Sequence, residues 1–289
     1  MGDVVNAQKR LDLTESDYHG DPCARPSLSS SIAKVLLDKS PLHAWHRHPR
    51  LGKGDREESK VFDAGRLGHK LLLGKGADVV RVDAGDWRKK AAQEERDAAY
   101  EAGKIPVLDA DYLEAEAAVA AIVRSLGRKG IVLDGESEVP ILWEETVSGH
   151  DNVLARGMLD HLCVSKHGAT IFDVKTSRSA HPRACSAHVV EYGYDTQRAA
   201  YVRAVEALYP EIRGRVDFVH LFVELDAPHA VTPGRVDGVL RERGERRWAR
   251  AVEVWAECLA FGTWPDYADR IITIEAPPWA LSQLQETDR

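Results

Sequence analysis

The chain has 289 residues, 44% of them apolar, which is enough to bury a large core in one elaborated domain. Its formal net charge of −7 argues against a protein that coats nucleic acid through overall charge, so any DNA contact must use local basic surface. No apolar run approaches the roughly 18 residues of a membrane span, and no signal peptide is visible. We therefore expect a soluble, cytoplasmic protein with no membrane partner.

The first part of the chain is predicted to be helical. Residues 1–26 carry scattered polar groups and two prolines, and we expect a loose N-terminal arm there, followed by one domain over 27–289. Order is expected to begin near Ser29, where hydroxyl side chains can cap a helix that ends at Ser40-Pro41. Two further helices are predicted over about 61–73 and 109–126.

From about residue 131 the apolar pattern changes from the helical period to the alternation of strands. Residues 138–145 place Val139, Ile141 and Trp143 on one face, and Pro140 marks an edge or a bulge. Beyond this strand we predict strands over 154–164, 169–176 and 217–225, and helices over 195–208 and 244–262. This order of elements indicates a mixed α/β core.

An acidic residue two positions before a lysine occurs twice. Glu58-Ser59-Lys60 lies in a charged stretch, whereas Asp173-Val174-Lys175 ends an apolar strand. In the second match the acid and the lysine share one face of the strand, because side chains alternate. A structural ion pair at the strand end is the alternative to a functional site.

A hairpin brings a second carboxylate toward this pair. A two-residue loop at His167-Gly168 puts Asp160 opposite Lys175 and makes Asp160 a diagonal neighbour of Asp173, about 7 to 8 Å away at Cα. Two such carboxylates suit Mg²⁺, with the backbone carbonyl of Val174 as a further ligand. Glu138 on the preceding strand is favoured over Glu136, which has the same parity, as the third carboxylate.

This residue set suits phosphodiester hydrolysis, since a metal polarises the phosphoryl oxygen and lowers the pKa of a bound water. Lys175 would orient the attacking water or help to deprotonate it, and would offset charge in the transition state. The sequence therefore predicts a metal-dependent phosphodiesterase site at Asp160, Asp173 and Lys175.

Several motifs, in this order, resemble the PD-(D/E)XK nucleases of the RecB, RecE and lambda exonuclease group. They are Gly65-Arg66-Leu67-Gly68-His69, Gly157-Met158-Leu159-Asp160, Asp173-Val174-Lys175 and Gln197-Arg198-Ala199-Ala200-Tyr201. The chain is more similar still to the RecE-like (exodeoxyribonuclease VIII) phage family, from about residue 18 to 280. That likeness rests on the serine-rich start, Ser40-Pro41-Leu42-His43, Glu138-Val139 with Trp143, Trp264-Pro265-Asp266-Tyr267 and Pro277-Pro278-Trp279. A long additional segment found in some RecE proteins is missing from the sequence.

The resemblance implies a restriction-endonuclease-like α/β fold with a central mixed sheet flanked by helices. It also implies a Mg²⁺-dependent exonuclease, with Mn²⁺ as a substitute, that degrades linear duplex DNA to expose single strands for recombination. Alternatives are an endonuclease or a catalytically idle DNA-binding scaffold of the same fold. His69 would approach the metal, and Gln197 and Tyr201 would position the site or the DNA. Ser29, Ser31, Arg66, Arg156 and Arg198 are expected to contact nucleic acid.

Partners and cofactors follow from the same likeness. Duplex DNA ends, a single-strand annealing protein and a ring-shaped homo-oligomer are the expected partners. Some nucleases of this superfamily hold a [4Fe–4S] cluster with one early and three late cysteines. Here Cys258 is the only cysteine in the last hundred residues, so we expect no cluster.

Overall fold

The computed structural model describes residues 4–52, 54 and 64–280, and its centre is a mixed β-sheet flanked by helices. The strand order is β1-β5-β6-β7-β8-β9, with β2 paired to β6, and a separate two-stranded sheet joins β3 and β4. The bounds are β1 (Val4–Lys9), β2 (Leu28–Ser29), β3 (Val79–Val82), β4 (Ile105–Leu108), β5 (Glu136–Glu145), β6 (Val153–Ser165), β7 (Gly168–Thr176), β8 (Val216–Val223) and β9 (Val231–Gly234). This confirms the predicted fold class.

Helices cover both faces of the sheet because successive strand residues point to opposite sides. One core joins Val139, Ile141 and Ile171 to helices α2, α8 and α9, and a second joins Val174 and Leu221 to α4 and α6. The helices are α1 (Glu15–His19), α2 (Ser30–Asp38), α3 (Pro41–Arg47), α4 (Ala64–Leu73), α5 (Lys90–Glu101), α6 (Asp109–Arg128), α7 (Pro182–Tyr192), α8 (Tyr194–Leu208) and α9 (Gly238–Phe261), with a 3₁₀ turn at Pro210–Ile212.

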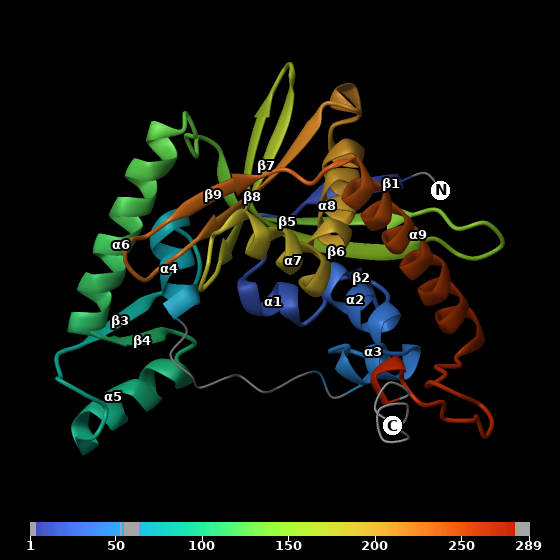
Figure 1. Ribbon diagram of the computed structural model, residues 1–289, viewed down its shortest axis with the longest axis horizontal. Helices are drawn as coiled ribbons and strands as arrows, with labels where there is room; N and C mark the ends of the chain where they lie inside the picture. The colour runs from blue at the N-terminus through green and yellow to red at the C-terminus, as the bar shows by residue number, and fades with distance from the viewer. Residues whose placement is uncertain (1–3, 53, 55–63, 281–289) are drawn as a thin grey trace, which may run out of the picture.

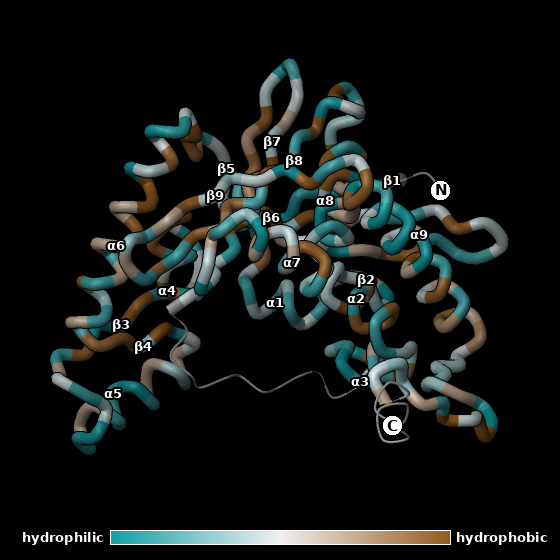
Figure 2. Tube along the Cα trace, in the orientation of Figure 1, coloured by the Kyte–Doolittle hydropathy of each residue, from teal (hydrophilic) through white to brown (hydrophobic). Residues whose placement is uncertain are grey.

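The helices extend the molecule on two sides of the sheet. Figure 1 shows α4, α6, β3, β4 and α5 at one end, and α2, α3 and α9 at the other. Apolar and hydrophilic residues alternate along the trace of α9 in Figure 2, as expected for a helix that buries one face. Within the described ranges no helix is both long and apolar enough to cross a bilayer.

The expectation of a loose arm over residues 1–26 is wrong for the part that the structure describes. Val4–Lys9 forms the strand β1, which pairs antiparallel with β5 at the edge of the sheet. The helix α1 follows and begins with a capping box. The Thr14 side chain accepts a hydrogen bond from the Asp17 backbone nitrogen, and the Asp17 side chain accepts one from the Thr14 backbone nitrogen. The polar composition concealed this strand because its partner lies more than a hundred residues away along the chain.

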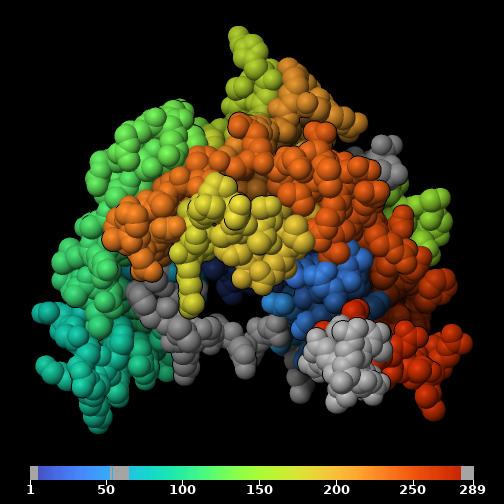
Figure 3. Space-filling model, in the orientation of Figure 1, coloured from blue at the N-terminus to red at the C-terminus, as the bar shows by residue number. Residues whose placement is uncertain are grey.

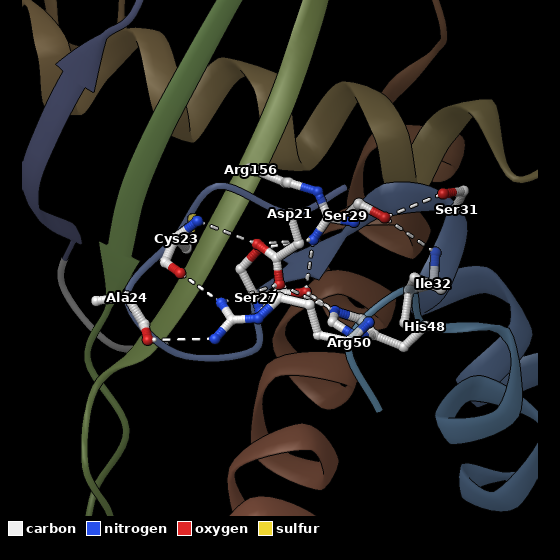
Figure 4. Close-up of polar contacts among 10 residues, drawn as sticks. All are labelled: Asp21, Cys23, Ala24, Ser27, Ser29, Ser31, Ile32, His48, Arg50 and Arg156. Carbon is white, nitrogen blue, oxygen red and sulfur yellow. Dashed lines mark hydrogen bonds and ion pairs between the residues drawn. The ribbon is translucent and has the colours of Figure 1, made fainter. Parts of the chain in front are cut away.

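Asp21 is the buried centre of the polar cluster drawn in Figure 4. Its carboxylate accepts hydrogen bonds from the backbone nitrogen of Ser27 at 2.9 Å and from the Ser27 hydroxyl at 2.7 Å. The side chains of His48 and Arg156 lie 3.3 Å and 3.4 Å from it. Burial opposes ionisation, but His48 and Arg156 outweigh it and lower the pKa of Asp21 to about 2. The segment before α2 is thereby fixed to β6.

Several helices were missed or begin earlier than predicted. The chain does not leave helical structure at Ser40-Pro41, because Ser40 caps α3 and Pro41 occupies its first turn, where a missing N–H costs nothing. The helix α9 begins at Gly238, six residues before the predicted start, with Asp237 as its cap. Helices α5 and α7 were not predicted. Residues 61–63 of the helix predicted over 61–73, and the Glu58-Ser59-Lys60 match, lie outside the described residues.

The hairpin register also differs from the prediction. Ser165 pairs with Gly168, so the two loop residues are Lys166 and His167, not His167 and Gly168. The ladder runs on to His161 and Phe172, and its continuation puts Asp160 opposite Asp173 where Lys175 was expected. The error is two residues along one strand, so every side chain keeps its predicted face.

Candidate active site

The predicted site lies where the sheet splits along β6. Residues Ala155 and Arg156 of this strand pair with β2, whereas residues from His161 onward pair with β7. Asp160 lies between these two ladders. Its side chain takes the place of a backbone acceptor for β7, since Oδ2 accepts a 2.7 Å hydrogen bond from the Val174 nitrogen. The carboxylate is thus fixed to the backbone of the Asp-x-Lys segment.

His69 on α4 lies between two carboxylates. Its Nδ1 is 3.1 Å from Oε1 of Glu138, and its Nε2 is 3.3 Å from Oδ2 of Asp160. Burial alone would lower the pKa of His69, but the hydrogen bonds to Asp160 and Glu138 raise it to about 10. The two acids therefore favour the protonated form of the imidazole that lies between them.

The structure places Glu138 and Glu136 in different surroundings. Glu138 adopts a positive φ of 51°, an uncommon conformation outside glycine, and faces His69. Glu136 instead forms a 2.8 Å ion pair with Lys9 of β1. Of the two glutamates, Glu138 is therefore the one that lies at the candidate site.

Asp173 is fully buried and has three side-chain partners. Its Oδ1 accepts from Nε2 of Gln197 at 3.0 Å, and its Oδ2 lies 2.8 Å from Nζ of Lys175 and 3.3 Å from Nδ1 of His220. Burial opposes ionisation of Asp173, but the charge of Lys175 and the contact with His220 lower its pKa. The pKa of Asp160 is raised, first by burial and then by the negative charge of Asp173.

Lys175 is held as a cation. Burial would lower its pKa, but Asp173 and Asp160 raise it. Its Nζ also lies 4.5 Å from the ring centroid of Tyr194, in a cation–π contact. A lysine in these surroundings supplies positive charge and hydrogen-bond donors to the site.

The two ends of the Gln-x-x-x-Tyr pattern contact both strands of the site. Gln197 holds Asp173, and Tyr201, one helical turn later, is buried against Gly157. A Cβ at Gly157 would lie 2.6 Å from Cε1 of Tyr201, which explains why this position has no side chain. Burial raises the pKa of Tyr201, and hydrogen bonds with Gln197 and Ser30 oppose this only in part.

The predicted metal-site residues form two adjoining groups. One contains Glu138, His69 and Asp160, and the other contains Asp173 and Lys175 with Gln197 and His220. Within the described residues, no three His, Cys, Asp or Glu side chains are arranged to hold a metal ion. His69 contacts the carboxylates of Glu138 and Asp160, and Lys175 contacts that of Asp173.

The donor set nevertheless fits a hard divalent cation. Asp160 and Asp173 are carboxylates on neighbouring strands, and the pKa of Asp160 is raised in part by the charge of Asp173. A cation that binds oxygen ligands would relieve this repulsion. Val174 lines the same cleft, so its carbonyl remains a candidate ligand.

An open cleft of about 780 Å³ leads to Glu138 and Asp160. Figure 3 shows a hollow on this face between the end containing β3, β4 and α5 and the end containing α2 and α3. Basic side chains line the cleft from both ends, namely Lys34, Lys39, Arg47, Arg66, Lys70 and Lys75. The overall charge is negative, but these basic side chains are gathered along the cleft, which Glu15 and Asp38 also line.

The five residues expected to contact nucleic acid separate into two sets. Ser29, Ser31 and Arg66 line the cleft, although Ser29 is buried and caps α2 through the Ile32 nitrogen. Arg156 also borders the cleft, but it is 4% exposed and its guanidinium binds Ser27 and Asp21. The Arg198 guanidinium lies 3.4 Å from Glu245 of α9 and is not among the residues that line the cleft. These contacts assign Arg156 and Arg198 structural roles instead.

Two residues beside the site were not anticipated. His220 bonds Asp173, and Tyr194 contacts Lys175. The parallel pairing of β7 with β8 puts His220 opposite Asp173, and such a long-range register cannot be derived from a single sequence. For Tyr194 a local signal existed, because it precedes Gln197 by three residues and so lies near the same helix face.

Comparisons with known proteins agree with this fold. The sequence model described as a PDDEXK-like domain of unknown function (DUF3799) matches residues 29–277. No curated protein matches the chain. A crystal structure described as "Putative exonuclease" from Eubacterium rectale has a TM-score of 0.56 at 15% identity and covers 93% of this chain and 98% of its own. A structure of SSO0001, at 17% identity over 64% of this chain and 83% of its own, has a TM-score of 0.27, too low to support an argument.

Proposed function

We propose, from the premise that the chain belongs to the family of PDDEXK-like domains of unknown function (DUF3799), that it is a divalent-metal-dependent nuclease acting on linear duplex DNA. The proposal further specifies Mg²⁺ as the metal, with Mn²⁺ as a substitute, and exonucleolytic digestion that exposes single strands. The observation that carries it is the approach of Asp160 to the Asp173-Val174-Lys175 segment through the Val174 nitrogen.

Each residue has a distinct part in this proposal. Glu138, Asp160 and Asp173, with the Val174 carbonyl, would hold the metal, and Gln197 fixes one oxygen of Asp173. Mg²⁺ bound there would polarise the scissile phosphate and lower the pKa of the attacking water. Lys175 would orient that water and offset negative charge as the phosphate is attacked, because its ammonium remains protonated.

His69 contacts two of the acids that would hold the metal. Its imidazolium lies between Glu138 and Asp160 and offsets their charges. A neutral imidazole is the form that ligates metals. His69 would therefore give up its proton if it approaches the metal as a ligand, which the family resemblance implies.

Incubation of linear and closed circular duplex DNA with Mg²⁺, with EDTA as a control, tests the proposal. Progressive loss of linear DNA alone, abolished by EDTA, is the expected result. Nicking of circles would assign an endonuclease, and binding without cleavage would assign a DNA-binding scaffold. Replacement of Mg²⁺ by Mn²⁺ should preserve digestion, since both ions accept oxygen ligands.

The proposed biological setting is recombination from DNA ends. The exposed single strand would pass to an annealing protein, and a ring-shaped homo-oligomer would let an acidic chain enclose its substrate. Both proposals rest on the resemblance to RecE-like nucleases. Light scattering measures the second directly, since a ring requires a mass several times the 32.0 kDa of one chain.

A further inference from the structure

A run of aromatic rings leads from the surface of the cleft to the candidate site. The ring centroids of His188 and Tyr192 lie 5.4 Å apart, and those of Tyr192 and Tyr194 lie 5.6 Å apart. Tyr194 then lies 5.9 Å from His220, which bonds Asp173. The planes of Tyr192 and Tyr194 differ by 33° and those of Tyr194 and His220 by 35°, so these three rings are tilted only moderately from parallel.

The local backbone gives the two tyrosines their positions. Tyr192 ends α7, Gly193 adopts φ +71°, and Tyr194 begins α8. The left-handed conformation suits glycine, and a Cβ at this position would also lie 3.4 Å from Cδ of Lys34 on α2. The turn brings both rings to the cleft, where all three residues of this segment line the wall.

Tyr192 is 48% exposed, whereas Tyr194 is partly buried and contacts Phe222. The outer ring is therefore available to a ligand, and the inner ring supports it from behind. Tyr194 also holds Nζ of Lys175 at 4.5 Å from its centroid. The exposed ring of Tyr192 is therefore linked to Lys175 by two contacts, Tyr192 with Tyr194 and Tyr194 with Lys175.

The surrounding charges suit a polynucleotide strand. Lys34 of α2, Lys39 of the link between α2 and α3, and Arg47 of α3 line the cleft with Tyr192. Stacking rings combined with a basic groove are the usual means of binding unpaired nucleotides, because every base has a π-face and every phosphate a negative charge. A paired base inside a duplex could not stack on the ring, since its faces already contact neighbouring bases.

We infer that Tyr192, supported by Tyr194, binds an unpaired nucleobase of the strand being cut, close to the scissile phosphate. This inference rests on the proposed function, because it places DNA in the cleft. It adds that the substrate end is frayed when it is bound. The base at that end that lies nearest to Tyr192 would leave the duplex stack and pack against the tyrosine ring.

A double-mutant cycle between protein and DNA tests the inference. The Kd for DNA is measured for wild-type and Tyr192→Ala proteins, with Ca²⁺ in place of Mg²⁺ so that binding is measured apart from cleavage. The DNA is an intact linear duplex or one of a series that carry a single abasic residue at successive positions from either end. We expect Tyr192→Ala to raise the Kd for intact duplex roughly 5- to 150-fold, the range for loss of one base–aromatic stack. At one position, removal of the base should weaken the wild type equally and leave the variant unaffected.

Two variants serve as controls. Tyr192→Phe keeps the ring and loses only the hydroxyl, so its Kd should stay within about twofold of the wild type. Tyr267→Ala removes an exposed tyrosine that packs on His43 outside the cleft, and it should change nothing. The inference would be overturned if Tyr192→Ala bound DNA as tightly as the wild type. It would also be overturned if the effects of Tyr192→Ala and of base removal were additive at every abasic position.

The double-mutant cycle measures DNA binding and does not depend on cleavage. Coupling at one position without digestion in Mg²⁺ would support the stacking site and refute the nuclease. Digestion without coupling would leave the nuclease intact and remove the stacking site. The two failures are therefore distinguishable with the same proteins.

Discussion

Gly157 of β6 lies against the ring of Tyr201 on α8, so closely that a Cβ at this position would be 2.6 Å from Cε1 of the tyrosine. The contact joins the strand that carries Asp160 to the helix that carries Gln197. Because Gln197 bonds Asp173, the spacing of strand and helix controls the geometry of the site.

Gly157→Ala should lower the free energy of unfolding by roughly 1 to 3 kcal/mol, the usual range for overpacking a filled core. Activity should fall as well, because α8 must move and carries Gln197 with it. Denaturant titration measures the first effect. Gly127→Ala is the matched control, since nothing lies within 4 Å of that glycine in α6 and alanine is the better helix former. Equal stability of Gly157→Ala and wild type would contradict the contact.

Asp21→Asn should lower the free energy of unfolding by roughly 3 to 5 kcal/mol at pH 7, because it leaves the buried guanidinium of Arg156 without its carboxylate. The folded-state pKa is lowered to about 2, so this contribution is present above the unfolded value of about 3.9 and is lost as pH falls through 2. Urea titrations from pH 7 downward should show the gap between the two proteins narrowing by about 2 to 3 kcal/mol below about pH 4.

Asp12→Asn is the control for that experiment. The pKa of Asp12 is also lowered to about 2, by Arg10, but this ion pair is exposed to solvent. Its removal should leave stability almost unchanged, since water and salt screen such pairs. A gap between wild type and Asp21→Asn that stays constant down to pH 2 would show that the carboxylate charge contributes nothing.

The cleft predicts which arginine matters for DNA. Arg66 is exposed and lines the cleft, so Arg66→Ala should weaken binding of all sequences alike and reduce the slope of log K against log salt by about one. Arg198→Ala should leave both quantities unchanged, because Arg198 faces Glu245 outside the cleft. Anisotropy titrations at several salt concentrations decide the matter. A larger effect at Arg198 than at Arg66 would place the DNA elsewhere.

Lys175→Ala should reduce cleavage by roughly 10²- to 10³-fold, the loss typical of one group that stabilises transition-state charge. Lys9→Ala is the control, because Lys9 forms an ion pair of the same 2.8 Å length with Glu136 at the β1 edge of the sheet, away from the candidate site. Both variants are compared with wild type in cleavage rate and melting temperature. Equal cleavage rates in the two variants would show that Lys175 is only a structural partner of Asp173.

Much of this arrangement could be predicted from local sequence patterns. Period-two alternation located β5, β6 and β7, and the hairpin error of two residues preserved the faces of Asp160 and Asp173. The hydroxyls before α2 marked its start, where Ser29 is the cap. Local periodicity and capping therefore sufficed wherever the determining contacts lay within one element or one hairpin.

Long-range contacts set the remainder. The strand β1 depends on its pairing with β5, and His220 meets Asp173 only because β8 joins β7 in parallel. The separation of Asp160 and Asp173 into two groups depends on which side chain takes each oxygen, namely His69 for the first and Gln197 for the second. The roles expected of Arg156 and Arg198 likewise changed because acidic partners bind them, the buried Asp21 for Arg156 and the partly exposed Glu245 for Arg198.

The Asp173→Asn variant tests the central claim most directly. Its amide keeps the shape of the carboxylate but loses the charge that would hold a divalent cation, so cleavage of linear duplex DNA in Mg²⁺ should fall by orders of magnitude while DNA binding persists. Asp217→Asn on the neighbouring strand, which breaks a surface ion pair with Arg235, should cleave normally. If correctly folded Asp173→Asn protein cleaves linear DNA at the wild-type rate, Asp173 is no metal ligand and the proposed nuclease site is wrong.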